Sequence, residues 1–153
     1  MAKTMEVSNS VTINKSNQEV FDYLKYSKNQ GEFSVWNMLD PDQKRTYKGE
    51  DGTVGFIYCW DSKNKNVGAG SQEIKKIVDG ERIEYELRFV RPMKNIANSQ
   101  FIIKKKSDTE SEVFWDFQGP MKFPMSLFSG MFKKMMNKDM SQSLANLKEK
   151  LEG

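Results

Sequence analysis

Between Leu127 and Leu151, large apolar side chains recur at steps of three and four residues. This spacing predicts one long amphipathic helix with a broad apolar face. Five of the ten methionines lie between Met125 and Met140, and methionine side chains adapt well to irregular surfaces. The face consists of Leu127, Phe128, Met131, Phe132, Met135, Met136, Met140, Leu144, Leu147 and Leu151. A face of this width needs a large partner element.

The partner is indicated by residues 47–118, where apolar and polar residues alternate with period two, as in half-buried β-strands. An earlier alternation predicts a first strand at 5–13. Six further strands are predicted at 44–48, 53–61, 67–78, 82–90, 98–106 and 112–118. The turns between them are short, and Asp79-Gly80 is typical of a tight hairpin. Strands joined in this way form an antiparallel meander.

Two short helices are expected between the first strand and the meander. Ser16 and Glu19 have the spacing of a capping box, which predicts a helix from Asn17. A second helical or turn segment is predicted at 27–35, followed by extended chain over 36–41. The fold class is therefore α+β: a curled seven-stranded antiparallel sheet wrapped around a long C-terminal helix. With 153 residues, we expect one domain covering 1–153.

The chain contains no histidine. This excludes Ser-His-Asp and Cys-His catalysis and the common histidine-bearing metal sites. An enzyme built on this sequence would have to use carboxylate, tyrosine, lysine or arginine side chains, and no catalytic constellation of these is recognisable. We expect no metal and no cofactor.

Charge and targeting signals limit the partners. The net charge of +3 is spread along the chain, whereas a nucleic-acid partner calls for a concentrated basic face. Lys133, Lys134 and Lys138 are typical of a membrane-surface helix or of the solvent side of a core-facing helix, which we favour. No apolar run has the length of a signal peptide or membrane span, and the single Cys59 excludes an internal disulfide framework. We expect a cytoplasmic protein without stable membrane insertion, of open oligomeric state.

Strand parity predicts which side chains face the interior. In 82–90 the inner set is Ile83, Tyr85, Leu87 and Phe89, and elsewhere it is Phe56, Tyr58, Trp60, Phe101, Ile103, Val113, Trp115 and Phe117. Gly68, Gly70 and Gln72 share a face with Ile74, so an amide is expected among aromatic rings. Glycines in a strand often mark a bend or a close approach. The parity of Glu73, Glu84, Glu86 and Arg88 points outward, which disfavours them as an acid–base set.

The order of elements and several local motifs together resemble the START-like, Bet v 1-like superfamily, in its bacterial polyketide cyclase/dehydrase-type branch. The resemblance spans almost the whole chain. Its motifs are Val11-Thr-Ile-Asn-Lys-Ser-Asn-Gln-Glu-Val20-Phe21, Trp36 with Asp40-Pro41, Tyr47-Lys-Gly49-Glu-Asp51-Gly52-Thr-Val54-Gly55 with Trp60, Val67-Gly68-Ala-Gly70-Ser-Gln72-Glu-Ile74, and Lys138-Asp-Met-Ser-Gln-Ser-Leu144-Ala-Asn-Leu147-Lys148. The resemblance implies a helix-grip fold around a hydrophobic cavity. It implies no single reaction, because members of the superfamily carry, sense or convert different small molecules.

Ten residues are the candidates for lining such a cavity, although a filled core would give the same pattern. They are Trp36, Tyr58, Trp60, Gln72, Tyr85, Trp115, Phe128, Met131, Phe132 and Met135. On the terminal helix, Phe128, Met131 and Met135 are the expected ligand-facing residues. Gln72, Tyr58 or Tyr85 would orient a ligand, since buried polar groups need partners.

The leading hypothesis is that the chain binds a small hydrophobic or amphipathic, lipid- or polyketide-like molecule between the sheet and the terminal helix. One alternative is an enzyme of the cyclase or dehydratase kind, which an inward-facing carboxylate with a raised pKa would favour. Another is a protein-interaction module of the co-chaperone type, which requires an exposed apolar patch.

Overall fold

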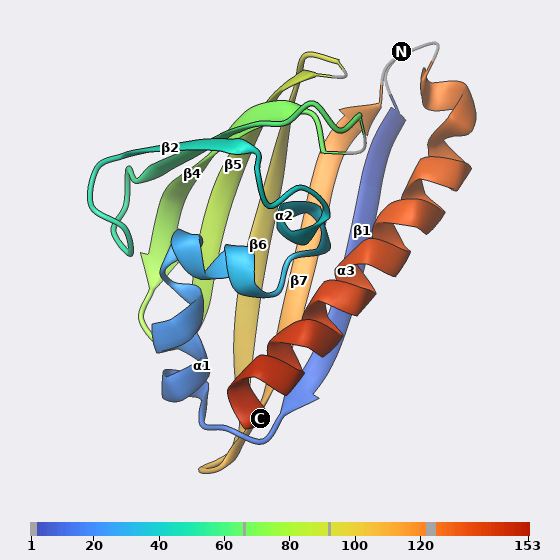
Figure 1. The fold of residues 1–153 in the computed structure, drawn as a ribbon. Coiled ribbons are helices and arrows are strands. Elements are labelled where there is room, and N and C mark those ends of the chain that lie inside the picture. Colours follow the sequence, from blue (N-terminus) through green and yellow to red (C-terminus); the bar gives the residue numbers. More distant parts are fainter. Residues whose placement is uncertain (1–2, 66, 92, 122–124) are drawn as a thin grey trace.

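The computed structural model describes residues 3–65, 67–91, 93–121 and 125–153. Within these ranges, seven strands form one antiparallel sheet, and the long C-terminal helix crosses one face of it (Figure 1). The elements are β1 (Lys3–Ile13), α1 (Asn17–Leu24), the 3-10 helix η1 (Ser27–Glu32), α2 (Val35–Leu39), β2 (Lys44–Lys48), β3 (Ile57–Asp61), β4 (Ala69–Val78), β5 (Arg82–Arg91), β6 (Asn95–Ser107), β7 (Glu110–Met121), the 3-10 helix η2 (Met125–Phe128) and α3 (Ser129–Glu152). The predicted α+β fold class is confirmed.

The strand order is β1-β7-β6-β5-β4-β3-β2 among the described residues. Strands β2 to β7 follow one another as the predicted meander, and β1 pairs with β7 along its whole length. The Asp79-Gly80 turn joins β4 to β5, with Gly80 at φ +73°, where glycine is favoured over residues with a Cβ. Short loops thus place residues of sequential strands side by side.

Helix α1 begins where the capping box predicts. The Ser16 hydroxyl oxygen accepts a hydrogen bond from the Glu19 backbone N–H at 3.2 Å, and its own O–H donates to the Glu19 carboxylate at 3.1 Å. Val20, Phe21 and Leu24 are buried on one side of the helix. A local signal was sufficient here because the cap and the apolar face both lie within one short segment.

Helix α2 corrects the prediction of extended chain over 36–41. The Val35 backbone N–H donates to the Ser143 hydroxyl oxygen at 2.9 Å, and the Asn146 side-chain amide donates to the Phe33 carbonyl at 3.1 Å. Both partners belong to α3, more than one hundred residues further along the chain. Tertiary contacts therefore fix the start of α2, and the local sequence does not reveal them.

Strand β3 also differs from the prediction, since it begins at Ile57 rather than at residue 53. The preceding loop contains Gly49, Gly52 and Gly55, all with positive φ. Three left-handed positions close together are incompatible with a regular strand. Phe56, although outside β3, is buried as strand parity suggested.

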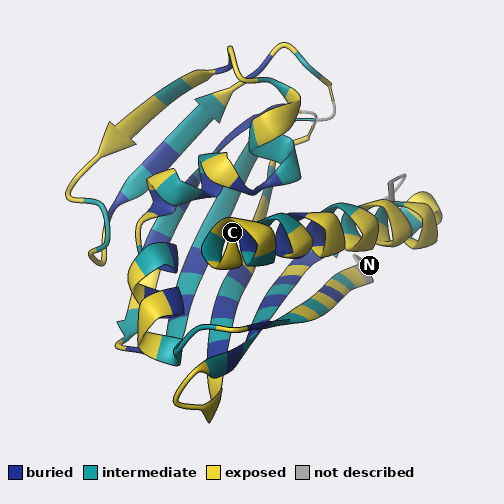
Figure 2. Ribbon diagram, turned by 60° about the horizontal axis from the view of Figure 1, so that its bottom comes forward, coloured by how far each residue is buried: buried dark blue, intermediate teal, exposed yellow. Residues whose placement is uncertain are grey.

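The core lies between the sheet and the helices, and buried residues alternate with half-buried or exposed ones along the strands (Figure 2). Its centre is a group of aromatic rings. The Phe101 and Trp115 rings stack with centroids 4.9 Å apart, and Phe33 meets both of them edge-on at 6.2 and 6.4 Å. Tyr85 contacts Phe101 edge-on at 6.1 Å. Offset and edge-to-face geometries of this kind are the favourable ones for aromatic pairs.

Helix α3 corrects the expectation for its inward face. Met140, Ser143, Leu144 and Leu147 are buried, and Met136 is half-buried, whereas Phe128, Met131 and Met135 are 52%, 55% and 49% exposed. Figure 1 shows the reason: α3 crosses the sheet obliquely, and its start lies beside β1, the edge strand. The first turns are correspondingly exposed in Figure 2. The apolar stripe is wider than the surface that the sheet offers.

Candidate functional site

A cavity of about 210 Å³ lies between the sheet, α2 and α3. Its walls are mostly aromatic and aliphatic, with amide and hydroxyl groups among them. The lining residues are Gln30, Ser34, Trp36, Asn37, Gln43, Tyr58, Trp60, Val67, Gln72, Leu87, Phe89, Arg91, Ser99, Trp115, Phe117, Met136 and Met140. All three tryptophans of the chain are in this set. The composition, apolar walls with a few polar groups, is that of a small-molecule site.

Tyr58 and Gln72 occupy directly opposite positions on β3 and β4. Because opposite residues of an antiparallel pair project from the same face, both side chains reach the cavity side by side. Leu87 on β5 lies opposite Gln72 in turn and also lines the cavity. The three strands thus place a phenol, an amide and an aliphatic side chain in one row.

The phenol of Tyr58 is held from α2. The Asn37 side-chain amide donates to the Tyr58 hydroxyl oxygen at 3.0 Å. The backbone carbonyl of Asn37 accepts hydrogen bonds from the Arg45 side chain at 2.9 Å and from the Gln43 side chain at 3.5 Å. Burial raises the pKa of Tyr58, so the phenol keeps its proton at neutral pH. Helix α2 therefore contributes directly to the site, because it carries Asn37 and Trp36.

The side-chain amide of Gln72 is buried, with 8% of the residue exposed. Its Nε2 atom has no hydrogen-bond partner among the described residues. A buried donor without a partner costs about 1–3 kcal/mol, so such groups are rare and call for an explanation. The Gln72 residue is part of the cavity lining.

Among the residues that line the cavity, Arg91 is charged, and it is exposed. Arg91 donates to an Asp61 carboxylate oxygen at 2.6 Å and to the Ser62 carbonyl at 2.8 Å. Among the described residues, no Asp or Glu lines the cavity. The inward-facing carboxylate that would favour acid–base catalysis is thus not part of this lining.

A family model for polyketide cyclase/dehydrase and lipid transport proteins matches residues 4–152. The chain belongs to this family. No protein with a curated function matches the sequence significantly. The START-like, Bet v 1-like resemblance of the sequence is confirmed by the family and by solved structures of the same fold.

Three solved structures illustrate the shared fold of the cyclase/dehydrase family member. Truncated norcoclaurine synthase from Thalictrum flavum is similar with a TM-score of 0.73 at 11% identity, covering 98% of this chain and 94% of that one. The Aha1 dimer from Colwellia psychrerythraea gives a TM-score of 0.65 at 12% identity, covering 97% and 96%. Ara h 8.0201 gives 0.66 at 10% identity, covering 97% and 98%. At these identities the likeness concerns the fold alone.

Of the ten candidate residues, the structure brings five together around the cavity: Trp36, Tyr58, Trp60, Gln72 and Trp115. Their role in binding stays a prediction.

The other five candidates lie elsewhere. Tyr85 is buried in the core against Phe101 and is not part of the lining. Phe132 is half-buried and also lies outside the lining. Phe128, Met131 and Met135 were expected to face a ligand, but they are exposed to solvent. They are exposed apolar side chains at the start of α3 and in the turn before it.

Several lining residues were missed by reasoning from the sequence. Met140 belongs to the recognised stripe of α3, but on the half that was not expected to face a ligand. Gln30, Ser34 and Asn37 lie in or beside η1 and α2, where no periodic pattern distinguishes a buried polar side chain from an exposed one. Gln30 and Ser34 are nevertheless buried, and Asn37 is half-buried.

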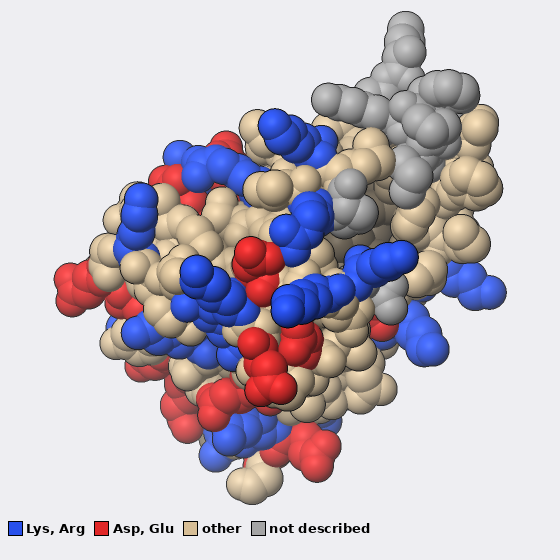
Figure 3. All heavy atoms as spheres, turned by 45° about the horizontal axis from the view of Figure 1, so that its top comes forward, with Lys and Arg blue, Asp and Glu red and all other residues tan. Residues whose placement is uncertain are grey.

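Four charged side chains of β4 and β5 lie outside the cavity lining, as their parity indicated: Glu73, Glu84, Glu86 and Arg88. Arg88 pairs with Glu73 at 2.8 Å and also with Glu86, and the Arg88 hydrogen bond lowers the pKa of Glu73. On the face drawn in Figure 3, Lys and Arg are interspersed with Asp and Glu.

Among the described residues, no group of His, Cys, Asp and Glu could hold a metal ion. No helix in the same part of the chain has the length and apolar character to cross a bilayer.

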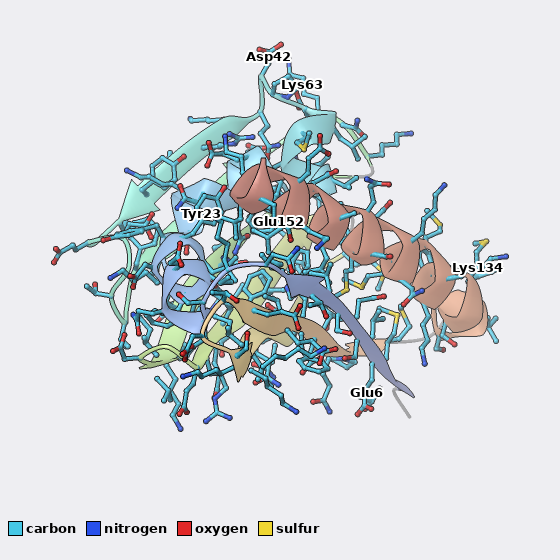
Figure 4. All side chains as sticks on the ribbon, turned by 90° about the horizontal axis from the view of Figure 1, so that it is seen from below. Glu6, Tyr23, Asp42, Lys63, Lys134 and Glu152 are labelled. Carbon is cyan, nitrogen blue, oxygen red and sulfur yellow. The ribbon has the colours of Figure 1, made fainter. Side chains whose placement is uncertain are left out.

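The two ends of α3 differ in their surroundings. In Figure 4, Glu152 lies near Tyr23 of α1, whereas Lys134 lies at the far, projecting end. Glu152 accepts from the Asn14 backbone N–H at 2.8 Å and pairs with Lys148 at 2.6 Å. The C-terminal end is thus anchored by polar contacts, and the cavity lies along the middle of the helix.

Alkaline pH is expected to destabilise the protein through Tyr85. Burial raises the pKa of this phenol well above its ordinary value of 10.0, so the stability that it contributes is complete below pH 10 and is lost as pH rises above it. The free energy of unfolding should fall above pH 10 by up to about 1.4 kcal/mol per pH unit from this group. Urea unfolding at several pH values measures the slope. Tyr85→Phe should flatten it, and equal slopes in the wild type and Tyr85→Phe would contradict the prediction.

Proposed function

We propose that this member of the polyketide cyclase/dehydrase and lipid transport family binds a small hydrophobic or amphipathic molecule in the cavity between the sheet and α3. The observation that carries the proposal is the cavity itself, of about 210 Å³, walled by Trp36, Trp60 and Trp115 and with polar groups grouped on β3, β4 and α2. Aromatic walls supply affinity through burial of apolar surface. The polar groups supply orientation.

The size of the cavity favours a compact ligand. An engineered protein cavity of about 150 Å³ holds one benzene molecule, so about 210 Å³ corresponds to one or two rings rather than to an extended acyl chain. Polyketide-like aromatic molecules are in this range. A structural neighbour with 11% identity, norcoclaurine synthase, has been solved in complex with dopamine and hydroxybenzaldehyde, both single-ring compounds. This supports a ligand of similar size here.

Titration with ethylnaphthalene, followed by heteronuclear NMR of the tryptophan indole N–H groups, tests the proposal. Because all three tryptophans line the cavity, we expect the three resonances to shift together. Leu87→Trp should fill the cavity and weaken binding about tenfold or more, since overpacking by a ring costs at least about 1.4 kcal/mol. Val90→Trp, on the same strand but exposed, is the matched control and should bind as the wild type does. Unchanged indole resonances, or equal binding by Leu87→Trp, would contradict the proposal.

A further inference from the structure

We propose that the polar end of the cavity is a subsite for a carbonyl oxygen, in which the Gln72 side-chain N–H and the Tyr58 O–H both donate hydrogen bonds to one neutral ligand. The inference rests on the proposed function, because it specifies which chemical group the cavity binds. It predicts a ring-sized ketone, aldehyde, ester or quinone rather than a carboxylate or a hydrocarbon.

The first donor is Gln72. Its Nε2 atom is buried and has no partner among the described residues, while the residue as a whole is 8% exposed. An amide nitrogen carries two N–H groups and accepts nothing, so its missing partner must be an acceptor. The strands around it have already used their backbone acceptors in the sheet. An acceptor supplied by a ligand in the adjoining cavity would remove the cost of the unpaired donor.

The second donor is Tyr58. Its hydroxyl oxygen already accepts a hydrogen bond from the Asn37 amide at 3.0 Å. The phenol hydrogen is directed by this contact away from Asn37, and among the described residues no acceptor receives it. Arg45 and Gln43 both donate to the backbone carbonyl of Asn37, which fixes α2 at this residue. The phenol is therefore positioned before any ligand arrives.

The two donors converge because of the register of the sheet. Tyr58 and Gln72 are directly opposite on β3 and β4, which sets their Cβ atoms about 5 Å apart on one face. Side chains at this separation can reach a single oxygen atom, and a carbonyl oxygen has two lone pairs to receive them. Two donors aimed at one oxygen form a more selective site than either alone.

The charge of the lining selects a neutral acceptor. Arg91 is the one charged side chain that lines the cavity among the described residues, and it is already paired with Asp61. A carboxylate ligand would lose its hydration and find no unpaired cation among the described lining residues, which is unfavourable. A neutral carbonyl group loses much less hydration and gains both hydrogen bonds.

Three matched probes separate the possibilities: acetonaphthone, which has the carbonyl group, ethylnaphthalene, which lacks it, and naphthoate, which carries a negative charge. Indole N–H shifts and isothermal titration measure the affinity of each for the wild type. We expect acetonaphthone to bind about tenfold more tightly than ethylnaphthalene, from two net hydrogen bonds, and naphthoate to bind most weakly. Gln72→Leu should abolish the preference for acetonaphthone and leave the affinity for ethylnaphthalene within about twofold.

Tyr58→Phe should reduce the preference in part, because one donor remains. Gln118→Leu removes the same amide from an exposed position on β7 and should leave all three affinities unchanged. Equal affinity for acetonaphthone and ethylnaphthalene, or a preference that survives in Gln72→Leu, would overturn the carbonyl subsite while leaving the cavity as a binding site. Tighter binding of naphthoate than of acetonaphthone would overturn the neutrality of the ligand. If none of the probes shifted the indole resonances, the proposed function itself would fail.

Discussion

Met140→Ala is expected to lower the free energy of unfolding by about 2–4 kcal/mol, since truncation of a buried methionine removes its burial energy and leaves a void. Met140 is 1% exposed and lies on α3 against the cavity. The loss should appear as a fall in melting temperature of several degrees, roughly 2–4 °C for each kcal/mol in a chain of this size. Thermal unfolding followed by circular dichroism measures it.

Met131→Ala is the matched control, because it makes the same change in the same helix at a side chain that is 55% exposed. We expect its unfolding free energy to stay within about 0.5 kcal/mol of the wild type. The pair tests which half of the α3 stripe faces the sheet. Equal losses in both variants, or a larger loss in Met131→Ala, would show that α3 packs in the other phase.

Gly70→Ala is expected to destabilise the protein by about 2–3 kcal/mol or more, as overpacking at a rigid site does. A Cβ atom at this position would lie 2.5 Å from the Arg88 carbonyl oxygen and 3.0 Å from the Trp60 ring. The Arg88 oxygen belongs to the neighbouring strand β5, so relief requires the sheet itself to shift. Chemical denaturation of the variant gives the change in unfolding free energy, and near-ultraviolet circular dichroism reports the displacement of Trp60.

Gly130→Ala separates the effect of crowding from that of replacing a glycine. Gly130 lies in α3, and nothing is within 4 Å of the position where its Cβ would lie. Alanine should therefore stabilise the protein by up to about 1 kcal/mol through helix propensity and a less flexible unfolded chain. A neutral or stabilising Gly70→Ala would show that β4 and β5 are further apart at this position than in the structure.

The sheet could be predicted from the sequence because strand periodicity is local. Alternation in 82–90 correctly separated inward Tyr85 from outward Glu84, and the parity of Gln72 placed this amide inside. The face of Gly70 was assigned in the same way, including the close approach that a glycine in a strand suggested. With a period of two residues, either of two strand faces can point to the core, and the face that carries the apolar side chains is the one that does.

The helices could be predicted less well, because their contacts are not local. The position of α2 depends on Ser143 and Asn146 of α3, so the segment around Trp36 has no signature of its own. The stripe of α3 is wide enough for two inward faces. Which of them is buried depends on the angle at which α3 crosses β1, and the spacing of apolar residues does not encode that angle.

The same limits explain how much of the site was foreseen. The tryptophans and the Tyr58–Gln72 pair came from strand parity and from large residues that must be buried. The polar cavity residues of η1 and α2 could not be predicted from the sequence, because polar residues near a short helix are most often exposed. Asn37 is the clearest example, since its role in the site is a single hydrogen bond to the Tyr58 hydroxyl oxygen.

Because some α3 methionines are exposed and others are buried, they differ in their susceptibility to oxidation. An oxidant such as hydrogen peroxide converts accessible thioethers to sulfoxides, which are polar. The Met131 and Met135 thioethers are accessible to such an oxidant, whereas Met140 is buried against the sheet. Oxidation would therefore make the projecting turns of α3 hydrophilic and leave the wall of the cavity apolar. The helix can change the character of its outer surface without changing the interior that it covers.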